Sequence, residues 1–281
     1  MRMQHPVHAL LLVTKPGQDD AQQTAREVQL WLREREVRTL LVENSLDQDN
    51  LELNGFVPDA ALVLGGDGTL LAVARKLRRH QIPLLGINLG HVGFLTEIEE
   101  EDWHPSLEQL LAQQGRISQR MALEFEVKRG DRTIHSGWAL NDVVVNRGRI
   151  ARLIGLDISI DSQPVGPIRA DGIVVATPTG TTAYAVSAGG PLVHPELEAI
   201  CMTPICPFMS HIRPMVLAAG HRIRIDITSH SAEACLTLDG QVGFDLLPGD
   251  AIHLQRSAFD ARFINLHPKA YLDKLHSKGY F

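Results

Sequence analysis

Cysteine is scarce in this sequence, and its few cysteines do not have the spacing of a metal site or a disulfide framework. Cys201, Cys206 and Cys235 are odd in number and include no C-x-x-C pair. Such a set favours reduced thiols in a cytoplasmic protein over a disulfide-stapled secreted one. The thirteen histidines show no H-E-x-x-H or similar spacing. The sequence therefore indicates a cytoplasmic location and leaves any metal ligands unassigned.

Long basic runs and long apolar runs are missing as well. The net charge is −6 over 281 residues, and the basic stretch at residues 75–79 lies at the expected end of a helix, where cations favour the dipole. This argues against nucleic acid or an acidic membrane surface as the main partner. The apolar run at residues 9–13 is too short for a signal-peptide core or a bilayer span.

Two common nucleotide-binding signatures are also absent. No G-x-x-x-x-G-K-[ST] occurs, so donor phosphates would not be held as they are in P-loop enzymes. No G-x-G-x-x-G follows the first expected strand, where Thr14-Lys15-Pro16-Gly17 stands instead. This argues against a nicotinamide-dependent oxidoreductase of the Rossmann type.

A glycine-rich string follows the apolar run at residues 60–64. It consists of Gly65, Gly66, Asp67, Gly68 and Thr69. The apolar run predicts a short buried strand, and the helical spacing of apolar residues over 70–80 predicts a helix with Thr69 as its N-cap. Glycines let a ligand approach the backbone, and a helix N-terminus offers unpaired N–H groups. Strand, turn and helix together predict a phosphate site.

Asp67 is unexpected in this string, because a carboxylate repels a bound phosphate. It would either hold a metal ion that bridges phosphates or accept the proton of an attacking hydroxyl, and both roles mean phosphoryl transfer. The structural alternative is a loop carboxylate satisfied by the N–H groups of its neighbours, since Asp and Gly are ordinary turn residues. The complete string in a strand–turn–helix context favours the functional interpretations.

Strands and helices alternate over residues 1–117, which predicts an α/β domain with a parallel sheet. Ligands bind such sheets at the carboxyl ends of the strands, where a second glycine turn, at residues 88–93, also falls. Apolar runs predict the strands of this domain, at residues 7–13, 38–42, 60–64 and 82–87. Helices are expected from Asp19 or Asp20 onward, over 70–80 and over 100–114.

Residues 118–266 show a different pattern, with short alternating strands separated by turn signals. This pattern predicts an all-β sandwich. The expected strands lie at residues 121–128, 133–145, 153–160, 172–177, 223–228, 234–238, 251–254 and 259–266. Residues 267–281 form a tail with a helical pattern, which we expect to pack back on the first domain.

Two polar stretches of the second domain are unusual for strands. Asn141-Asp142 interrupts an apolar run, and burying such a pair costs free energy unless it is bonded. Asp142 could accept hydrogen bonds from ribose hydroxyls, and Asn141 could meet a base or an amide. Alternatively, both side chains could bond the backbone at a bulge or an edge position. Residues 177–191 are dense in hydroxyls and glycine and carry Tyr184, which suits a nucleotide ligand but also a surface loop.

Residues 65–69 resemble a signature shared by NAD kinases, diacylglycerol and sphingosine kinases and, more distantly, 6-phosphofructokinases. Residues 177–191 together with Asn141-Asp142, residues 169–172 and Asp239-Gly240-Gln241 resemble NAD kinases of the bacterial type specifically. The resemblance runs from the first strand to Tyr280-Phe281. It implies a Rossmann-like, phosphofructokinase-like α/β domain followed by a β-sandwich.

The resemblance also implies transfer of the γ-phosphoryl group of ATP, or of polyphosphate in some members, to the 2′-hydroxyl of the adenosine ribose of NAD. Magnesium or another divalent cation accompanies the donor, and Asp67 matches the proton acceptor. A dimer or tetramer is implied, because part of the nicotinamide site comes from a neighbouring subunit. The implied NAD-binding residues are Asp67, Gly68, Phe94, Asn141, Asp142, Arg152, Arg169, Asp171, Thr179, Thr182, Ala183, Tyr184, Ala185, Val186, Ser187 and Gln241. The implied donor loop consists of Gly65, Gly66, Gly68 and Thr69.

The chain departs from the family pattern at Asp142, where glutamate is usual, so the shorter side chain would reach the ribose through water or a small backbone shift. Thr181 stands where serine is common. A lipid kinase is the nearest rival enzyme, but residues 177–191 are polar and the mean hydropathy is only −0.04. A dinucleotide sensor without catalysis is the rival from another class, and Asp67 argues against it. The donor, the choice between NAD and NADH, and feedback by NADP(H) are left open.

Overall fold

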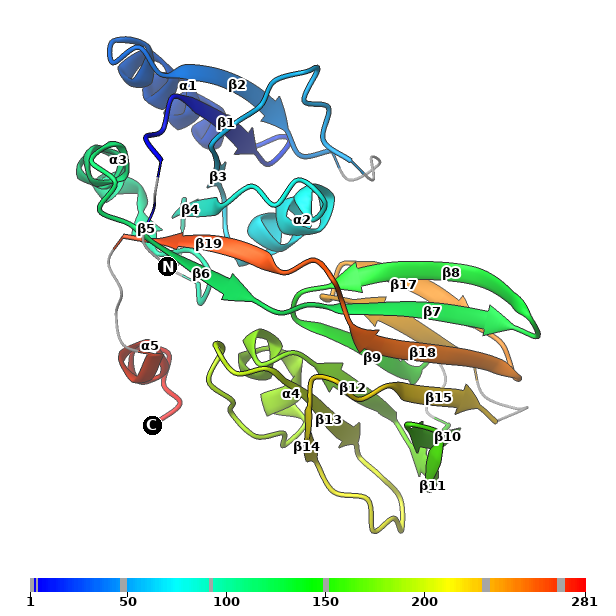
Figure 1. The fold of residues 1–281 in the computed structure, drawn as a ribbon. Coiled ribbons are helices and arrows are strands. Elements are labelled where there is room, and N and C mark those ends of the chain that lie inside the picture. The colour runs from blue at the N-terminus through cyan, green and yellow to red at the C-terminus, as the bar shows by residue number, and fades with distance from the viewer. Residues whose placement is uncertain are drawn as a thin grey trace. The chain divides into compact units, whose positions relative to one another are not determined.

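The computed structural model describes residues 3, 5–45, 50–90, 93–148, 152–228, 233–266 and 271–281. The chain divides into two compact units, whose elements Figure 1 shows. Each unit has its own hydrophobic core. The first unit contains Met1–Gln119 and Ala261–Phe281, and the second contains Arg120–Asp260. The expected fold class, an α/β domain followed by a β-sandwich, is confirmed.

The first unit is built around a sheet with the strand order β2-β1-β3-β4-β19-β6, with β5 beside β4. β1 pairs in parallel with β2 and β3, and β4 pairs in parallel with β3, β5 and β19, as the alternating pattern predicted. Its elements are β1 (Ala9–Thr14), α1 (Asp19–Arg33), β2 (Arg38–Glu43), β3 (Ala60–Leu64), α2 (Asp67–Leu77), β4 (Leu84–Asn88), β5 (Ile98–Glu99), a 3-10 turn (Glu100–Asp102), α3 (Trp103–Leu111), β6 (Arg116–Arg120), β19 (Ala261–Asn265) and α5 (Tyr271–Ser277).

The strand register brings the two glycine turns to one edge of this sheet. Thr14 pairs with Glu43 and Leu64, and Leu64 pairs with Ile87, so strands β1 to β4 end at the same level. Because the strands are parallel, the turns that follow β3 and β4 leave the sheet side by side. The amide of Gly65 donates to the carbonyl of Ile87 at 2.9 Å, which joins the starts of the two turns.

The last strand lies in a different sheet from the one expected. Residues 259–266 were expected in the β-sandwich, but β19 pairs in parallel with β4 through Phe263 and Leu84. Ile264 and Leu266 are buried in the core of the first unit. A short apolar run reveals a buried strand but not which sheet completes it. The tail packs back on the first unit, as expected, since Lys274 of α5 pairs with Glu97.

The second unit contains two six-stranded sheets, with the orders β11-β10-β15-β18-β7-β8 and β14-β13-β12-β9-β16-β17. Neighbouring strands within each of these sheets are antiparallel. The strands are β7 (Leu123–Arg129), β8 (Arg132–Ala139), β9 (Asp142–Arg147), β10 (Ile154–Ile160), β11 (Gln163–Ala170), β12 (Gly172–Ala176), β13 (Ala199–Ile205), β14 (Met215–Ala218), β15 (Ile223–Ile227), β16 (Ala234–Leu238), β17 (Val242–Leu246) and β18 (Asp250–Arg256).

Side chains alternate across the second of these sheets. Val143 and Val145 of β9 belong to the large core that also holds Phe125 of the opposite sheet. Val144, between them, faces the other way and packs in a smaller cluster with Ala185. One face of β9 therefore packs in the sandwich core, and the other packs with the segment that contains the short helix α4 (Tyr184–Ser187).

Several predicted elements need correction. Residues 133–145 form two strands, β8 and β9, in different sheets, and the chain changes sheet at Leu140-Asn141. β11, at a sheet edge, was missed because Pro164 and Pro167 lie within it, and prolines are tolerated at edges. β6, β13, β14 and β17 were also missed. The helix expected over 100–114 is shorter, since a 3-10 turn precedes α3.

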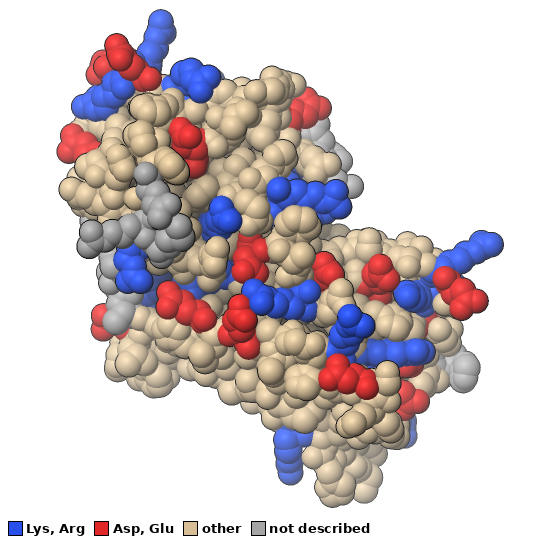
Figure 2. Space-filling model, in the orientation of Figure 1, with Lys and Arg blue, Asp and Glu red and all other residues tan. Residues whose placement is uncertain are grey.

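The surface carries charged side chains of both signs, as the composition of the sequence predicts. On the face shown in Figure 2, Lys and Arg side chains are interspersed with Asp and Glu. Within the described ranges, no helix combines the length and the apolar composition that crossing a bilayer requires.

Candidate active site

The glycine turn after β3 leads directly into α2. The helix begins at Asp67 with Gly66 as its N-cap, so the expected start at Leu70 with Thr69 as N-cap is wrong. The amides of Thr69 and Leu70 already donate to the carbonyl of Gly66, at 3.0 and 3.1 Å. A β-carbon on Gly65 would lie 2.8 Å from the Thr69 hydroxyl oxygen, so the turn requires glycine there. Gly66 and Gly68 are exposed, which leaves backbone available to a ligand.

Asp67, in the first turn of α2, directs its carboxylate to a segment about thirty residues further along the chain. Oδ2 accepts the amide of Phe94 at 2.7 Å. Oδ1 accepts the amides of Leu95 and Thr96, at 3.1 and 3.0 Å, and the Thr96 hydroxyl at 3.2 Å. The carboxylate is thus satisfied by N–H groups, as the structural alternative required, but the donors are distant in sequence. Four donors fix its orientation.

Gly93 makes this approach possible. A β-carbon on Gly93 would lie 1.9 Å from Oδ1 of Asp67. The amide of Gly93 donates to the Thr96 hydroxyl at 3.0 Å, which closes a tight loop over the carboxylate. Phe94 is half-buried, and its ring packs edge-to-face on Tyr280 with 5.7 Å between centroids. Gly93 and Thr96 were not singled out from the sequence, although Gly93 stands in the recognised glycine turn.

Three polar side chains are buried at the same edge of the sheet. Thr14 ends β1, Asn44 follows β2 and Asn88 ends β4, and each is at most 4% exposed. Among the described residues, Thr14 Oγ1, Asn44 Oδ1 and Asn88 Nδ2 have no hydrogen-bond partner. Buried polar atoms are normally paired, so each marks a place for water or for a polar group of a ligand.

Asn141 and Asp142 lie where the chain leaves β8 and enters β9, and Asp239 holds them there. The Asp239 carboxylate accepts the amides of Leu140, Asn141 and Asp142, at 3.3, 2.7 and 3.3 Å. In return the Asp239 amide donates to the carbonyl of Asp142 at 3.0 Å. The sequence places Asp239 in a motif but does not indicate its role. Its signal was a carboxylate at a glycine turn directly after an apolar strand.

The carboxyl of Asp142 lies in an environment that disfavours its charge. The residue is 3% exposed. Burial, and then the nearby charge of Asp239, raise the pKa of Asp142 to about 7, although a hydrogen bond from the Tyr184 amide opposes the shift. The Asp142 carboxyl, with this pKa, therefore titrates near neutral pH.

Residues 177–187 pack directly on Asn141. Thr177 donates its hydroxyl to the carbonyl of Leu140 at 2.6 Å and its amide to the carbonyl of Asn141 at 2.8 Å. A β-carbon on Gly180 would lie 2.1 Å from that same Asn141 carbonyl. Asn141 Oδ1 and the buried Thr179 Oγ1 have no partner among the described residues. The structure thus brings Asn141, Asp142 and residues 177–187 together, with Tyr184 44% exposed beside them.

The remaining predicted residues of the second unit lie away from residues 177–187 or on the surface of the unit. Arg169 is exposed in β11, and Asp171, before β12, forms a 2.7 Å ion pair with Arg147. The five residues of β12 separate this pair from residues 177–187, a distance of roughly 16 Å along the strand. Gln241, two residues after Asp239, and Arg152 are exposed.

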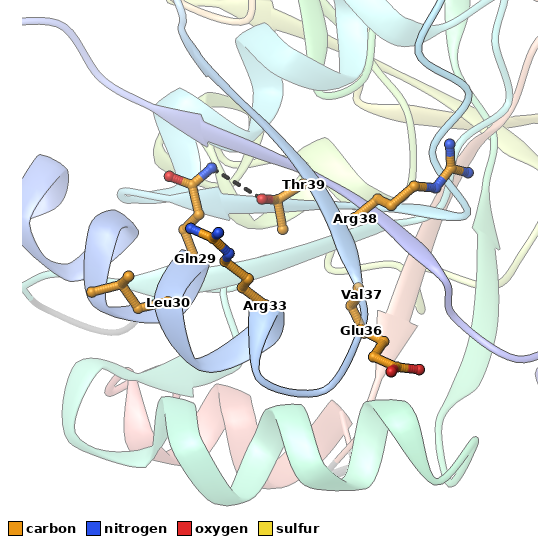
Figure 3. Close-up of a pocket in the computed structure, with 7 residues that line it drawn as sticks. All are labelled: Gln29, Leu30, Arg33, Glu36, Val37, Arg38 and Thr39. Atoms are coloured by element: carbon orange, nitrogen blue, oxygen red, sulfur yellow. Dashed lines mark hydrogen bonds between the residues drawn. The ribbon is translucent and has the colours of Figure 1, made fainter.

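A cavity of about 600 Å³ lies elsewhere on the first unit (Figure 3). It is lined by the end of α1 and the start of β2, and the side chains of Gln29 and Thr39 are hydrogen-bonded there at 3.0 Å. It lies at the amino ends of the parallel strands and contains none of the predicted site residues. Among the described residues, no group of three His, Cys, Asp or Glu side chains could hold a metal ion.

Family comparisons agree with the glycine turn and with the polar stretches of the second unit. The model of the ATP-NAD kinase N-terminal domain matches residues 54–115, and that of the ATP-NAD kinase C-terminal domain matches residues 140–266. A NAD kinase of Nitratidesulfovibrio vulgaris is 44% identical over 278 residues, which cover 99% of this chain and 98% of that protein. The chain belongs to the NAD kinase family.

Other relatives extend the likeness to more distant members of the NAD kinase family. A NAD kinase of Geobacter sulfurreducens is 41% identical over 264 residues, with 92% of this chain and 93% of that protein covered. Yeast NADH kinase in complex with NADH has a TM-score of 0.87 at 27% identity and covers 99% of this chain and 89% of its own. An Archaeoglobus fulgidus NAD kinase in complex with ATP has a TM-score of 0.77 at 29% identity. The match covers 96% of this chain and 98% of the Archaeoglobus chain.

Proposed function

We propose that this chain transfers the γ-phosphoryl group of ATP to the 2′-hydroxyl of the adenosine ribose of NAD and releases NADP and ADP. The observation that carries the proposal is the orientation of the Asp67 carboxylate, fixed by four donors beside an exposed glycine turn at a helix N-terminus. Membership of the NAD kinase family supports the same reaction.

Asp67 is proposed to accept the proton of the ribose hydroxyl. The hydroxyl oxygen forms a bond to the γ-phosphorus while the bond from that phosphorus to the β,γ-bridging oxygen breaks, and ADP leaves. A carboxylate offers about four lone-pair sites. Among the described residues, Oδ1 accepts from three donors and Oδ2 from the Phe94 amide, so Oδ2 is the oxygen proposed to accept from the ribose hydroxyl.

In the second unit, Asn141, Asp142, Thr179 and Tyr184 are proposed to bind NAD. Asn141 and Thr179 each present a polar atom without a partner among the described residues, and Asp142 lies beside them to accept from ribose hydroxyls. Tyr184 offers an exposed ring. The other proposed NAD contacts are Asp67, Gly68, Phe94, Arg152, Arg169, Asp171, Thr182, Ala183, Ala185, Val186, Ser187 and Gln241. The yeast relative binds NADH, so NADH is a second acceptor to test.

ATP is proposed to place its phosphates on the turn formed by Gly65, Gly66, Gly68 and Thr69. Exposed glycine backbone and the N-terminus of the eleven-residue helix α2 suit an anion. Magnesium is proposed to arrive with the ATP, because this ion keeps several waters and takes many of its ligands from substrate phosphates. The Archaeoglobus relative binds ATP, which supports this donor over polyphosphate.

A homodimer or homotetramer is proposed as the active form. Arg169 and Asp171 lie at the far end of β12 from residues 177–187, so a second copy is the proposed source of these two residues at the nicotinamide end. A cytoplasmic location is proposed on the three cysteines, all of which are free thiols.

The test is to incubate the protein with ATP, magnesium and NAD and to follow NADP with an NADP-specific dehydrogenase. Formation that requires all three components, and falls on the order of 10²–10⁴-fold in Asp67→Asn, is the expected result. Asp67→Asn should keep NAD binding measurable by calorimetry. Binding of NAD without turnover by any donor would indicate a sensor instead, and turnover with lipid vesicles in place of NAD would indicate a lipid kinase.

A further inference from the structure

The C-terminal tail contacts the segment that binds Asp67. Nζ of Lys274, in α5, lies 2.6 Å from Oε1 of Glu97 and 3.4 Å from the carbonyl oxygen of Phe94. The ring of Tyr280 packs on the ring of Phe94, at an interplanar angle of 73°. The tail therefore holds residues 94–97 at both ends, through an ion pair at one end and an aromatic contact at the other.

The Lys274–Glu97 pair is largely withdrawn from water. The side chain of Glu97 is 8% exposed and that of Lys274 is 19% exposed. Glu97 Oε2 has no hydrogen-bond partner among the described residues, so the bond from Lys274 to Oε1 is the main compensation for burying this carboxylate. Removing one partner of a buried pair leaves the other charge buried and uncompensated. Without Lys274, Glu97 is expected to move toward solvent.

A movement of Glu97 would reach Asp67 through the backbone. Glu97 directly follows Thr96, whose amide and hydroxyl both donate to Oδ1 of Asp67. The loop is tight, because Gly93 lies so close to the carboxylate that a β-carbon would overlap it. Displacing residues 94–97 would therefore withdraw donors that orient the carboxylate.

We propose that Lys274 is a positioning residue for phosphoryl transfer, acting through Glu97 and residues 94–96 on the carboxylate of Asp67. The proposal rests on the proposed function, in which Asp67 accepts the ribose proton. Among the contacts of the described residues, Lys274 reaches Phe94 and Glu97 but not Asp67 itself, so its effect on the reaction passes through the segment between them.

Three variants test the proposal kinetically. Lys274→Met keeps the unbranched apolar stem and removes the charged ammonium group. The kcat is expected to fall about tenfold to a hundredfold, as for a catalytic group misplaced by about 1 Å. The KM for ATP is expected to stay unchanged, because the glycine turn is not contacted. Lys274→Arg should restore most of kcat by keeping the ion pair. Lys278→Met, on an exposed lysine of the same tail, is the matched control and should leave kcat unchanged.

Amide hydrogen exchange provides a readout that does not depend on activity. The amides of Phe94, Leu95 and Thr96 donate to the carboxylate and should exchange slowly in the wild type. They should exchange faster in Lys274→Met and not in Lys278→Met. Glu97→Gln breaks the same pair more mildly and should change kcat and exchange in the same direction. Because both variants break one interaction, the double variant should lose no more kcat than Lys274→Met alone.

The outcomes separate this proposal from the proposed function. If the wild type makes no NADP but residues 94–96 exchange faster in Lys274→Met, the proposed phosphoryl transfer is overturned. The coupling between Lys274 and the Asp67 carboxylate would then still stand. If the wild type is active and kcat is unchanged in both Lys274→Met and Glu97→Gln, only the positioning role of Lys274 is overturned. A fall of kcat in Lys278→Met equal to that in Lys274→Met would also overturn it, because the effect would then belong to the tail in general.

Discussion

Asp67 of the first unit and Asp142 of the second are each an acidic candidate residue, and their surroundings are opposite. Asp67 stands at a helix N-terminus and accepts three backbone amides and a hydroxyl. Asp142 is buried next to a second carboxylate, Asp239, and has a pKa raised to about 7. The carboxylate of Asp67 is surrounded by hydrogen-bond donors. The carboxyl of Asp142 is buried beside another carboxylate, which disfavours its ionised form.

Different surroundings suit different tasks. A proton acceptor for a hydroxyl must be ionised and correctly oriented before the reaction begins. A ribose contact needs no charge in the empty site, and a carboxyl whose proton exchanges near neutral pH can adjust to what it binds. Pairs of acidic groups with contrasting environments often divide the roles in an active site. The contrast supports Asp67 as the base and Asp142 as a binding group.

Of the changes that break the supports of the two carboxylates, the largest effect is expected from breaking the donor loop around Asp67. In Gly93→Ala the new β-carbon would overlap the carboxylate, 1.9 Å from Oδ1, so the loop or Asp67 must move. We expect kcat to fall on the order of 10²-fold with NAD binding retained, measured by the coupled NADP assay and calorimetry. Gly90→Ala is the matched control, since nothing lies within 4 Å of its added carbon. Equal activity in the two variants would contradict the arrangement.

A smaller effect is expected from breaking the support of Asn141 and Asp142. Asp239→Ala removes the acceptor of three consecutive amides, so residues 140–142 lose their fixed position. The KM for NAD should rise about tenfold, because hydrogen bonds to a charged group are worth about 1.5–3 kcal/mol, while kcat changes less. Asp245→Ala, on the exposed surface of β17, is the control. A fall in kcat alone would assign Asp239 to the chemical step instead.

The donors to Asp67 and the Asp239 carboxylate that holds residues 140–142 could not be predicted from the sequence. The strand, the glycine turn and the presence of Asp67 could be predicted, because they form one local pattern of a few residues. The donors to Asp67 lie 27 to 29 residues away, and the acceptor for Asn141 lies 98 residues away. Such pairs are set by how the strands are arranged, and a single sequence does not display that arrangement.

The fold was predictable to a similar degree. The alternating pattern of the first unit and the turn signals of the second correctly indicated a parallel sheet and a sandwich. The pattern could not show that β19 returns to the first sheet, since burial gives an apolar run the same appearance in either sheet. It also joined β8 and β9, because Leu140 and the valines of β9 continue the apolar run across the change of sheet.

The last prediction concerns the proton of Asp142. With a pKa of about 7, raised from 3.8, the group is mostly neutral at pH 6 and mostly ionised at pH 8. If the carboxylate binds the ribose, the KM for NAD should fall several-fold as the pH rises from 6 to 8, with its midpoint near 7. Because the charge of Asp239 helps to raise this pKa, Asp239→Asn should move the midpoint to lower pH. In Asp142→Asn this dependence should disappear, whereas a wild-type slope in that variant would assign the proton to another group and leave Asp142 a structural residue.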